Sequence, residues 1–176
     1  MSAVRSRIQP MLTEAQLQAR IQELGAQIAG DYVGKDLIAV GLLNGVYPFF
    51  ADLTRAMPIE LDVSFMQVAS YHGGIHSTGE VKIIKDLDKA IQGRHCLVVE
   101  DIVDTGTTLH KVRNLLMDRE PASLRIVTLL DKPSRRKTDV QVDYVGFTIE
   151  DKFVVGYGLD FDGKFRNLPF VGVYQP

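Results

Sequence analysis

Three carboxylates and a run of small hydroxyl residues follow one another in the segment HCLVVEDIVDTGTTL, residues 95–109. The acids are Glu100, Asp101 and Asp104, and they come directly after an apolar run that is typical of a buried strand. In an open α/β sheet, ligands bind beyond the carboxyl ends of the strands. A buried carboxylate pair is costly unless it meets cations or hydrogen-bond donors. We therefore predict that Glu100 and Asp101 bind a sugar diol or a divalent metal.

The residues after the acids, Thr105, Gly106, Thr107 and Thr108, have the composition of an anion site. The free N–H groups and the positive dipole end of a helix N-terminus favour a phosphate there. Gly106 allows a close approach of the backbone, and the threonines add hydroxyl donors. A sugar phosphate would place its phosphate on the helix and its diol on the acids. The plainer alternative is that Asp104 caps the helix and the other two acids are a solvated strand end.

The elements that would position these residues alternate between strand and helix patterns. A T-x-x-Q capping box at Thr13 begins a helix that we expect to end at Gly30. Further helices are expected over 46–57 and after Gly106, and strands over 36–43, 59–68, 81–87, 96–100, 124–131, 143–149, 153–158 and 171–175. This order predicts one α/β domain, residues 1–176, with a mostly parallel twisted sheet flanked by helices. The C-terminal strands, with the N-terminus, would form a small hood.

The composition of the chain excludes several classes of protein. It has 176 residues and a net charge of −2, so no strong field draws it to nucleic acid or to an anionic membrane. The single cysteine, Cys96, rules out an internal disulfide and is expected in the core. No secretory signal and no apolar stretch of transmembrane length is present. We expect a cytoplasmic protein.

The segment VVEDIVDTGTTL resembles the phosphoribosyl-pyrophosphate binding motif of the type I phosphoribosyltransferases. The resemblance covers nearly the whole chain and is closest to the hypoxanthine-guanine phosphoribosyltransferases. Four further stretches carry it: GLLNGVYPF, SYHGGIHSTGEVKIIKD, LLDKPSRR and DKFVVGYGLDFDGKFRNLP. They resemble the pyrophosphate loop, the flexible active-site loop, the segment with the base-recognising lysine, and the purine-binding hood.

The resemblance implies roles around the sugar and its phosphates. Glu100 and Asp101 would hold the ribose hydroxyls, directly or through Mg²⁺, and Thr105–Thr108 would bind the 5′-phosphate. The peptide between Leu43 and Asn44, followed by Gly45, would be strained, cis, and in contact with pyrophosphate through its backbone. Family members often have lysine where this chain has Asn44, so only the backbone role is carried over.

The resemblance also implies roles around the base and the leaving group. Asp104 would face the purine N7 as the catalytic base or charge stabiliser, and Lys132 would donate to the purine O6. Phe153 would stack on the ring, and Val154 would read its pyrimidine edge through the backbone. The remaining implied roles are a second Mg²⁺ on Asp160, pyrophosphate on Arg166, and a flexible lid that begins with Ser70 and Tyr71.

The implied function is purine salvage, with Mg²⁺-dependent synthesis of IMP or GMP from hypoxanthine or guanine and phosphoribosyl pyrophosphate by a homodimer or homotetramer. A xanthine-preferring enzyme is the nearest alternative. A second alternative, a nucleotide-sensing regulator that binds RNA, would need a basic face, which the net charge of −2 disfavours. The basic cluster Arg135–Lys137 is either a solvated loop face or a group near phosphates or a subunit contact. His72 and His76 are four apart but separated by Gly73 and Gly74, which disfavours zinc binding on a helix.

Overall fold

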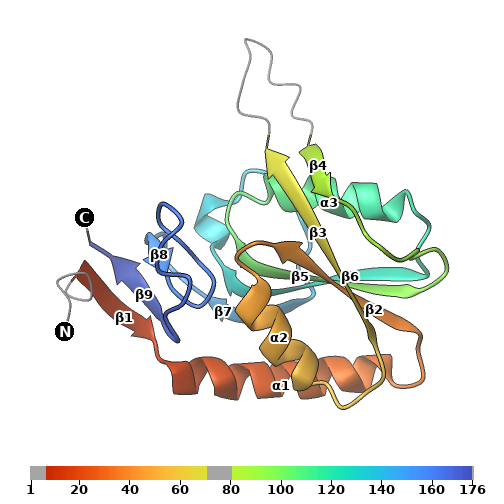
Figure 1. The fold of residues 1–176 in the computed structure, drawn as a ribbon, viewed down its shortest axis with the longest axis horizontal. Helices are drawn as coiled ribbons and strands as arrows, with labels where there is room; N and C mark the ends of the chain where they lie inside the picture. Colours follow the sequence, from red (N-terminus) through yellow and green to blue (C-terminus); the bar gives the residue numbers. More distant parts are fainter. Residues whose placement is uncertain (1–6, 71–80, 176) are drawn as a thin grey trace, which may run out of the picture.

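The computed structural model describes residues 7–70 and 81–175. Its strands are β1 (Ile8–Leu12), β2 (Leu37–Leu43), β3 (Asp62–Ser70), β4 (Val81–Lys85), β5 (His95–Val103), β6 (Ser123–Asp131), β7 (Tyr144–Thr148), β8 (Val154–Val155) and β9 (Val171–Tyr174). A six-stranded sheet has the order β4-β3-β2-β5-β6-β7, and a three-stranded sheet has the order β1-β9-β8. All neighbours in the larger sheet pair in parallel except β4, which is antiparallel to β3 (Figure 1). The predicted mostly parallel α/β sheet is confirmed.

Two hydrophobic cores cover the larger sheet, one for each face. The helices α1 (Glu14–Tyr32) and α2 (Tyr47–Arg55) pack in one core, and α3 (Thr107–Met117) packs in the other. Along β2, Ala39 faces the first core while its neighbours Ile38 and Val40 face the second. This alternation explains why β2 is apolar without interruption, since both faces of a parallel sheet are buried. Within the described ranges, no helix is long and apolar enough to cross a membrane.

The start of α1 agrees with the sequence prediction, but its end does not. Thr13 Oγ1 accepts from the Gln16 N–H at 3.2 Å, and Gln16 Oε1 accepts from the Thr13 N–H at 2.9 Å, so the predicted capping box is present. The helix continues through Gly30 to Tyr32, whose ring is buried. The packing of Tyr32 extends the helix, and the chain turns at Gly34, which has a φ of +73°.

The third strand begins later than its alternating pattern predicts. β3 starts at Asp62 rather than at residue 59, and Val63 is exposed. Ser64 and Met66 are buried instead, while Phe65 packs on the opposite core against Phe50 with ring centroids 4.7 Å apart. The strand β3 therefore has covered side chains on both faces of the sheet.

The small sheet forms the hood and joins the two ends of the described chain. β1 pairs antiparallel with β9, and β9 pairs with β8 (Figure 1). The sequence pattern did not identify β1 as a strand because Pro10 interrupts it. Pro10 is tolerated because β1 lies at the edge of its sheet, where a missing N–H donor costs little.

Candidate active site

The carboxyl ends of β5 and β6 bring the predicted acids and the predicted lysine together. β5 runs on to Val103, so Glu100 and Asp101 lie inside the strand rather than at its end as expected. Val103 pairs with Asp131, and the Lys132 N–H donates to the Val103 carbonyl oxygen at 2.9 Å. Asp104 and Lys132 therefore leave two neighbouring parallel strands at the same edge of the sheet.

A cavity of about 280 Å³ opens at this edge. It is lined by Asp101, Ile102, Asp104, Lys132, Phe153, Val154, Leu159, Asp160 and Arg166. All of these except Ile102 and Leu159 were predicted from the sequence as site residues. The two that were missed are apolar side chains inside the same motifs, and their residue type gives no signal of a ligand. Glu100, Leu43–Gly45 and Thr105–Thr108 were also predicted, but they lie around the cavity rather than on its wall.

Glu100 and Asp101 are adjacent acids whose side chains are only partly exposed to solvent. Burial raises the pKa of Glu100 well above its ordinary value, and the adjacent Asp101 charge raises it further. Burial also raises the pKa of Asp101, although a hydrogen bond from Glu100 opposes that shift. The alternative of a solvated strand end is therefore wrong. Two half-buried acids in contact favour a ligand that brings a cation or hydroxyl donors.

The loop that was predicted to hold pyrophosphate lies against these acids. The Leu43–Asn44 peptide is cis, as expected. A Cβ placed on Gly45 would lie 1.8 Å from Asp101 Oδ2, and one placed on Gly158 would lie 1.8 Å from the Gly45 carbonyl oxygen. Only glycines allow the loop, Asp101 and the hood segment to approach this closely.

The turn into α3 leaves the start of the helix without a side-chain cap. Gly106 is the N-cap residue, with a φ of +78°, so the alternative that Asp104 caps this helix is wrong. Thr138 packs against the turn: its N–H donates to the Thr105 carbonyl oxygen, and its hydroxyl lies 3.1 Å from Thr107 Oγ1. The Thr107 N–H donates to Thr105 Oγ1 at 3.4 Å. A glycine-containing turn at a helix N-terminus suits a phosphate because of the backbone dipoles that point out of the helix start.

The hood supplies an aromatic face and an ion pair to the cavity. Phe153 is 53% exposed and stands edge-on to Phe161, with ring centroids 5.7 Å apart. Arg166 pairs with Asp160 Oδ1 at 2.8 Å and donates to the Gly158 carbonyl oxygen at 2.7 Å. Asp160 Oδ2 accepts from the Gly163 N–H at 2.8 Å. Both oxygens of Asp160 thus already have partners within the hood.

Lys132 and Asp104 face the cavity with different partners. The Lys132 side chain is buried, and its Nζ donates to the Lys152 carbonyl oxygen at 2.6 Å. Asp104 Oδ1 lies 2.8 Å from Arg135 Nε, and the Asp104 carbonyl oxygen accepts from Arg136 Nη1 at 2.8 Å. The cluster Arg135–Lys137 is therefore more than a solvated loop face, since two of its arginines hold Asp104. The sequence feature that could have indicated this contact is the position of the cluster, which begins three residues after Lys132.

The acids on β5 fit a magnesium ion better than a structural metal centre. Among residues 7–70 and 81–175, no group of three or more His, Cys, Asp and Glu side chains is arranged to hold a metal. Mg²⁺ does not need such a group, because it keeps several waters and binds through one or two carboxylates plus substrate phosphates. Glu100 and Asp101, which accept backbone hydrogen bonds but form no ion pair among the described residues, suit that role. His72, His76 and Tyr71 lie outside the described residues, and Ser70 is the last residue of β3.

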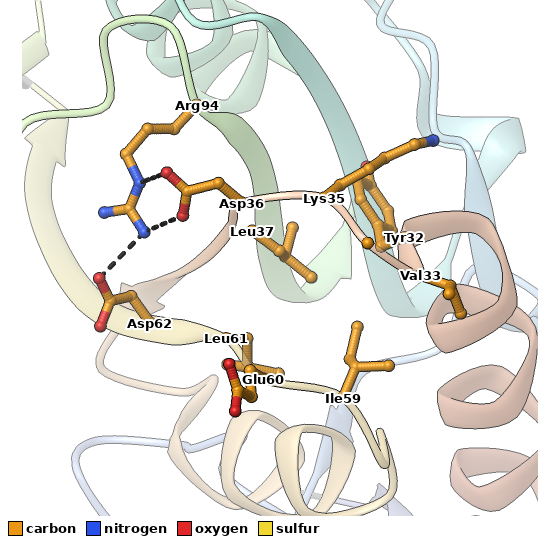
Figure 2. A pocket seen from close by; sticks show the side chains of 11 residues that line it. Tyr32, Val33, Lys35, Asp36, Leu37, Ile59, Glu60, Leu61, Asp62 and Arg94 are labelled. Carbon is orange, nitrogen blue, oxygen red and sulfur yellow. Dashed lines mark hydrogen bonds and ion pairs between the residues drawn. The ribbon is translucent and has the colours of Figure 1, made fainter.

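A larger cavity, of about 670 Å³, lies at the opposite, amino ends of the strands. Figure 2 shows its lining, in which Arg94 lies between Asp36 and Asp62. Leu37 and Asp62 are the first residues of β2 and β3, and Arg94 directly precedes β5. No residue predicted to do chemistry lines this cavity.

Comparison with known proteins agrees with this geometry. Residues 11–162 match the family described as "Phosphoribosyl transferase domain". A hypoxanthine-guanine phosphoribosyltransferase of Staphylococcus aureus is 52% identical over 166 residues, which are 94% of this chain and 93% of the relative. A hypoxanthine phosphoribosyltransferase of Salmonella typhimurium is 52% identical over 167 residues, 94% of each chain.

Solved structures show the same fold. A crystal structure of a Staphylococcus aureus hypoxanthine phosphoribosyltransferase has a TM-score of 0.95 and 49% identity, covering 99% of this chain and 96% of the other. A hypoxanthine-guanine phosphoribosyltransferase from Bacillus anthracis has a TM-score of 0.89 and 42% identity, covering 93% and 96%. The chain belongs to the type I phosphoribosyltransferase family. Within that family it is a member of the hypoxanthine(-guanine) phosphoribosyltransferases, which are enzymes of purine salvage.

Proposed function

We propose that this chain transfers the 5-phosphoribosyl group from phosphoribosyl pyrophosphate to N9 of hypoxanthine or guanine, giving IMP or GMP and pyrophosphate. One observation carries the choice of base. A single cavity is lined by a carboxylate, Asp104, by a buried lysine, Lys132, and by the exposed ring of Phe153. The names of the relatives point to the same bases.

Lys132 would select bases that carry an oxygen at C6. Its side chain is buried and lines the cavity, where its ammonium would donate a hydrogen bond to a purine O6. Adenine offers an amino group at this position, so a donor would meet a donor. Sites built to hydrogen-bond one group reject an analogue that lacks it by about 10⁴–10⁵-fold. The base would stack on Phe153 and present its pyrimidine edge to the backbone of Val154.

Asp104 would take the proton from the purine N7 side as N9 attacks the ribose C1′. A positioned general base of this kind contributes about 10²–10⁴-fold to the rate. The Asp104 carboxylate lines the cavity and pairs with Arg135 at 2.8 Å. The proposed base therefore stands beside the space that the purine would occupy.

The sugar and its phosphates would lie along the edge of β5 and the turn into α3. Glu100 and Asp101 would bind the ribose hydroxyls, and Thr105–Thr108 would bind the 5′-phosphate at the N-terminus of α3. Pyrophosphate would lie on the backbone of Leu43–Gly45 and on Arg166. A lid that begins with Ser70 and Tyr71 would exclude water, which would otherwise hydrolyse the activated sugar.

Magnesium would be held by Glu100 and Asp101, with Asp160 as a weaker site because Arg166 and the Gly163 N–H already occupy its oxygens. When bound, Mg²⁺ would neutralise charge on the leaving pyrophosphate. We also propose a homodimer or homotetramer, on the family resemblance alone, and light scattering on the purified protein would measure its mass.

A panel of bases tests the proposed function. Hypoxanthine, guanine, xanthine and adenine are each offered with phosphoribosyl pyrophosphate and Mg²⁺, and nucleotide formation is followed by chromatography. We expect hypoxanthine and guanine to be used and adenine to be a poor substrate. Lys132→Ala should lose about 10–10²-fold in kcat/KM for hypoxanthine and guanine, the worth of a hydrogen bond to a charged group, and barely change the affinity for phosphoribosyl pyrophosphate.

The control for this panel is Lys35→Ala, which removes a lysine at the other end of the strands. It should leave the base preference and kcat/KM unchanged. Adenine conversion by the wild-type protein at the rate of hypoxanthine would refute both the role of Lys132 and the 6-oxopurine assignment. A preference for xanthine over both other oxopurines would favour the alternative enzyme.

A further inference from the structure

Arg135 connects two of the charged groups of the cavity, Asp104 and Lys132, without lining the cavity itself. Its Nε lies 2.8 Å from Asp104 Oδ1, and its Nη1 lies 3.4 Å from Asp151 Oδ1. The same Asp151 oxygen lies 3.9 Å from Lys132 Nζ. A row of alternating charges, Asp104–Arg135–Asp151–Lys132, therefore joins the proposed N7 group to the proposed O6 group. We call these four residues the charge row.

We propose that Arg135, supported by Asp151, is a positioning residue that fixes the orientation of the Asp104 carboxylate for the purine. The proposal rests on the function proposed above, because it assigns Arg135 a task only if Asp104 acts on the base. A catalytic base that is held by a third group is a recurring arrangement in enzymes, since the orienting group removes unproductive rotamers.

The direction from which Arg135 approaches supports positioning rather than obstruction. Asp104 contributes to the cavity wall, whereas Arg135 does not. The oxygen that meets Arg135, Oδ1, is shielded from solvent; its contact with Arg135 is an ion pair, and it accepts no hydrogen bond from the described residues. The guanidinium therefore holds the carboxylate from outside the space for the purine. This arrangement leaves the cavity side of the carboxylate for N7.

The local backbone makes this arrangement rigid. Lys132 is followed by a 3₁₀ turn, Pro133–Arg135, and the Arg135 N–H closes the turn on the Lys132 carbonyl oxygen at 3.1 Å. Pro133 fixes its own φ, which restricts the turn further. From the next residue, Arg136 Nη1 holds the Asp104 carbonyl oxygen at 2.8 Å. The backbone and the side chain of Asp104 are thus anchored by consecutive arginines.

The chemistry of the side chain explains why arginine suits this position. A guanidinium carries several N–H donors in a fixed plane and serves two carboxylates at once. A lysine in its place would keep the charge but would reach only one carboxylate in one geometry. Without any cation here, Asp104 would lose its partner and could turn toward the Lys132 ammonium. Both proposed purine contacts would then be disturbed together.

The test compares Arg135→Ala, Arg135→Lys and Asp151→Asn in steady-state kinetics with hypoxanthine. Arg135→Ala should lower kcat by about 10–10²-fold, the cost of misplacing a catalytic group, with the KM for phosphoribosyl pyrophosphate nearly unchanged. Arg135→Lys should recover part of that loss, and Asp151→Asn should lower kcat less than Arg135→Ala. The matched control is Arg55→Ala, which removes an exposed arginine that also pairs with one carboxylate, Asp52, on α2.

A double variant separates this proposal from the proposed function. If Arg135 acts through Asp104, Arg135→Ala should have almost no further effect on kcat in an Asp104→Asn background. An unchanged kcat in Arg135→Ala, or the same fold-loss in both backgrounds, would overturn the positioning role while leaving the proposed function intact. Normal turnover by Asp104→Asn alone would instead remove Asp104 from the mechanism and overturn both. Arg135→Lys serves the same comparison if the alanine variant unfolds.

Discussion

The two cavities described above lie at opposite ends of the same parallel strands, and their acidic residues differ in how their charge is balanced. At the amino ends, Arg94 binds both oxygens of Asp36 at 2.9 and 2.7 Å and also Asp62 at 2.9 Å (Figure 2). Lys89 adds a second cation to Asp62 at 2.6 Å. Hydrogen bonds from Lys89 and then from Arg94 lower the pKa of Asp62. Charges at this end are satisfied within the protein.

At the carboxyl ends, burial raises the pKa of both Glu100 and Asp101, and Asp101 lies on the cavity wall. Clustered groups with perturbed pKa values are typical of functional sites because the ligand, rather than the protein, completes their charge balance. The cavity at this end is nevertheless the smaller of the two. The proposed site in this molecule is therefore distinguished by acids whose charge the protein does not balance, Glu100 and Asp101, rather than by the volume of its cavity.

The largest expected effect comes from the carboxyl end. Asp104→Asn should fold normally and bind phosphoribosyl pyrophosphate, while kcat falls by about 10²-fold or more because a general base is lost. Steady-state kinetics and calorimetric titration measure these quantities separately. Asp118→Asn, an exposed acid at the end of α3, is the control. Near-normal turnover of the Asp104 variant would mean that this end of the sheet does not use its carboxylate as a base.

An intermediate effect concerns stability rather than rate. Glu100→Gln should raise the free energy of unfolding near neutral pH by about 0.5–2 kcal/mol, the range expected when an active-site liability is removed. The folded-state pKa of Glu100 is raised. The protonated side chain therefore stabilises the folded protein fully at pH values below the unfolded pKa, and this stabilisation is lost as pH rises through the folded pKa. The gain from the variant should therefore shrink as pH falls toward about 4, where the unfolded side chain titrates.

Urea unfolding in a chelator at several pH values measures this gain. Glu23→Gln, which alters an exposed acid on α1 paired with Arg20, is the matched control and should show no comparable gain. A Glu100 variant that is less stable than the wild-type protein at neutral pH would contradict the view that this acid is held without compensation.

The smallest effect is expected at the amino ends of the strands. Arg94→Met should lower the free energy of unfolding by about 1 kcal/mol or less, because partly exposed ion pairs contribute little. The loss should shrink at acidic pH, since Asp62 has a lowered folded pKa and its stabilising ionised form disappears as pH falls through that value. kcat and KM should stay at wild-type values. A large loss of activity in this variant would break the division of the molecule into a structural end and a catalytic end.

Local sequence was enough to predict the elements whose signals lie within a few residues. The capping box at Thr13 and Gln16 formed as expected, because both partners belong to one helical turn. The apolar run of β2 formed a strand buried on both faces, and the apolar positions of α3 face the core. The motif residues Asp101, Asp104 and Lys132 reached one cavity because parallel neighbouring strands end at the same edge.

Features that depend on distant partners could not be read in the same way. β1 is a strand because β9, at the other end of the chain, pairs with it. The sequence of residues 8–12 alone does not indicate this partner. The helix α1 passes Gly30 because Tyr32 finds a buried position. Asp104 appeared able to cap α3, yet the turn packs on Thr138 and places Gly106 at the cap.

The sequence by itself determined the chemistry of the site: which acids, which lysine, which hydroxyl-rich turn, and which family they resemble. Only the tertiary structure decided how those groups are held, including the pairing of Arg135 with Asp104 and the contact of Gly45 with Asp101. The physical reason is that residue type and spacing act locally along the chain. Burial, ion pairing and close approach arise only when the sheet, the hood and the turn after β6 have come together.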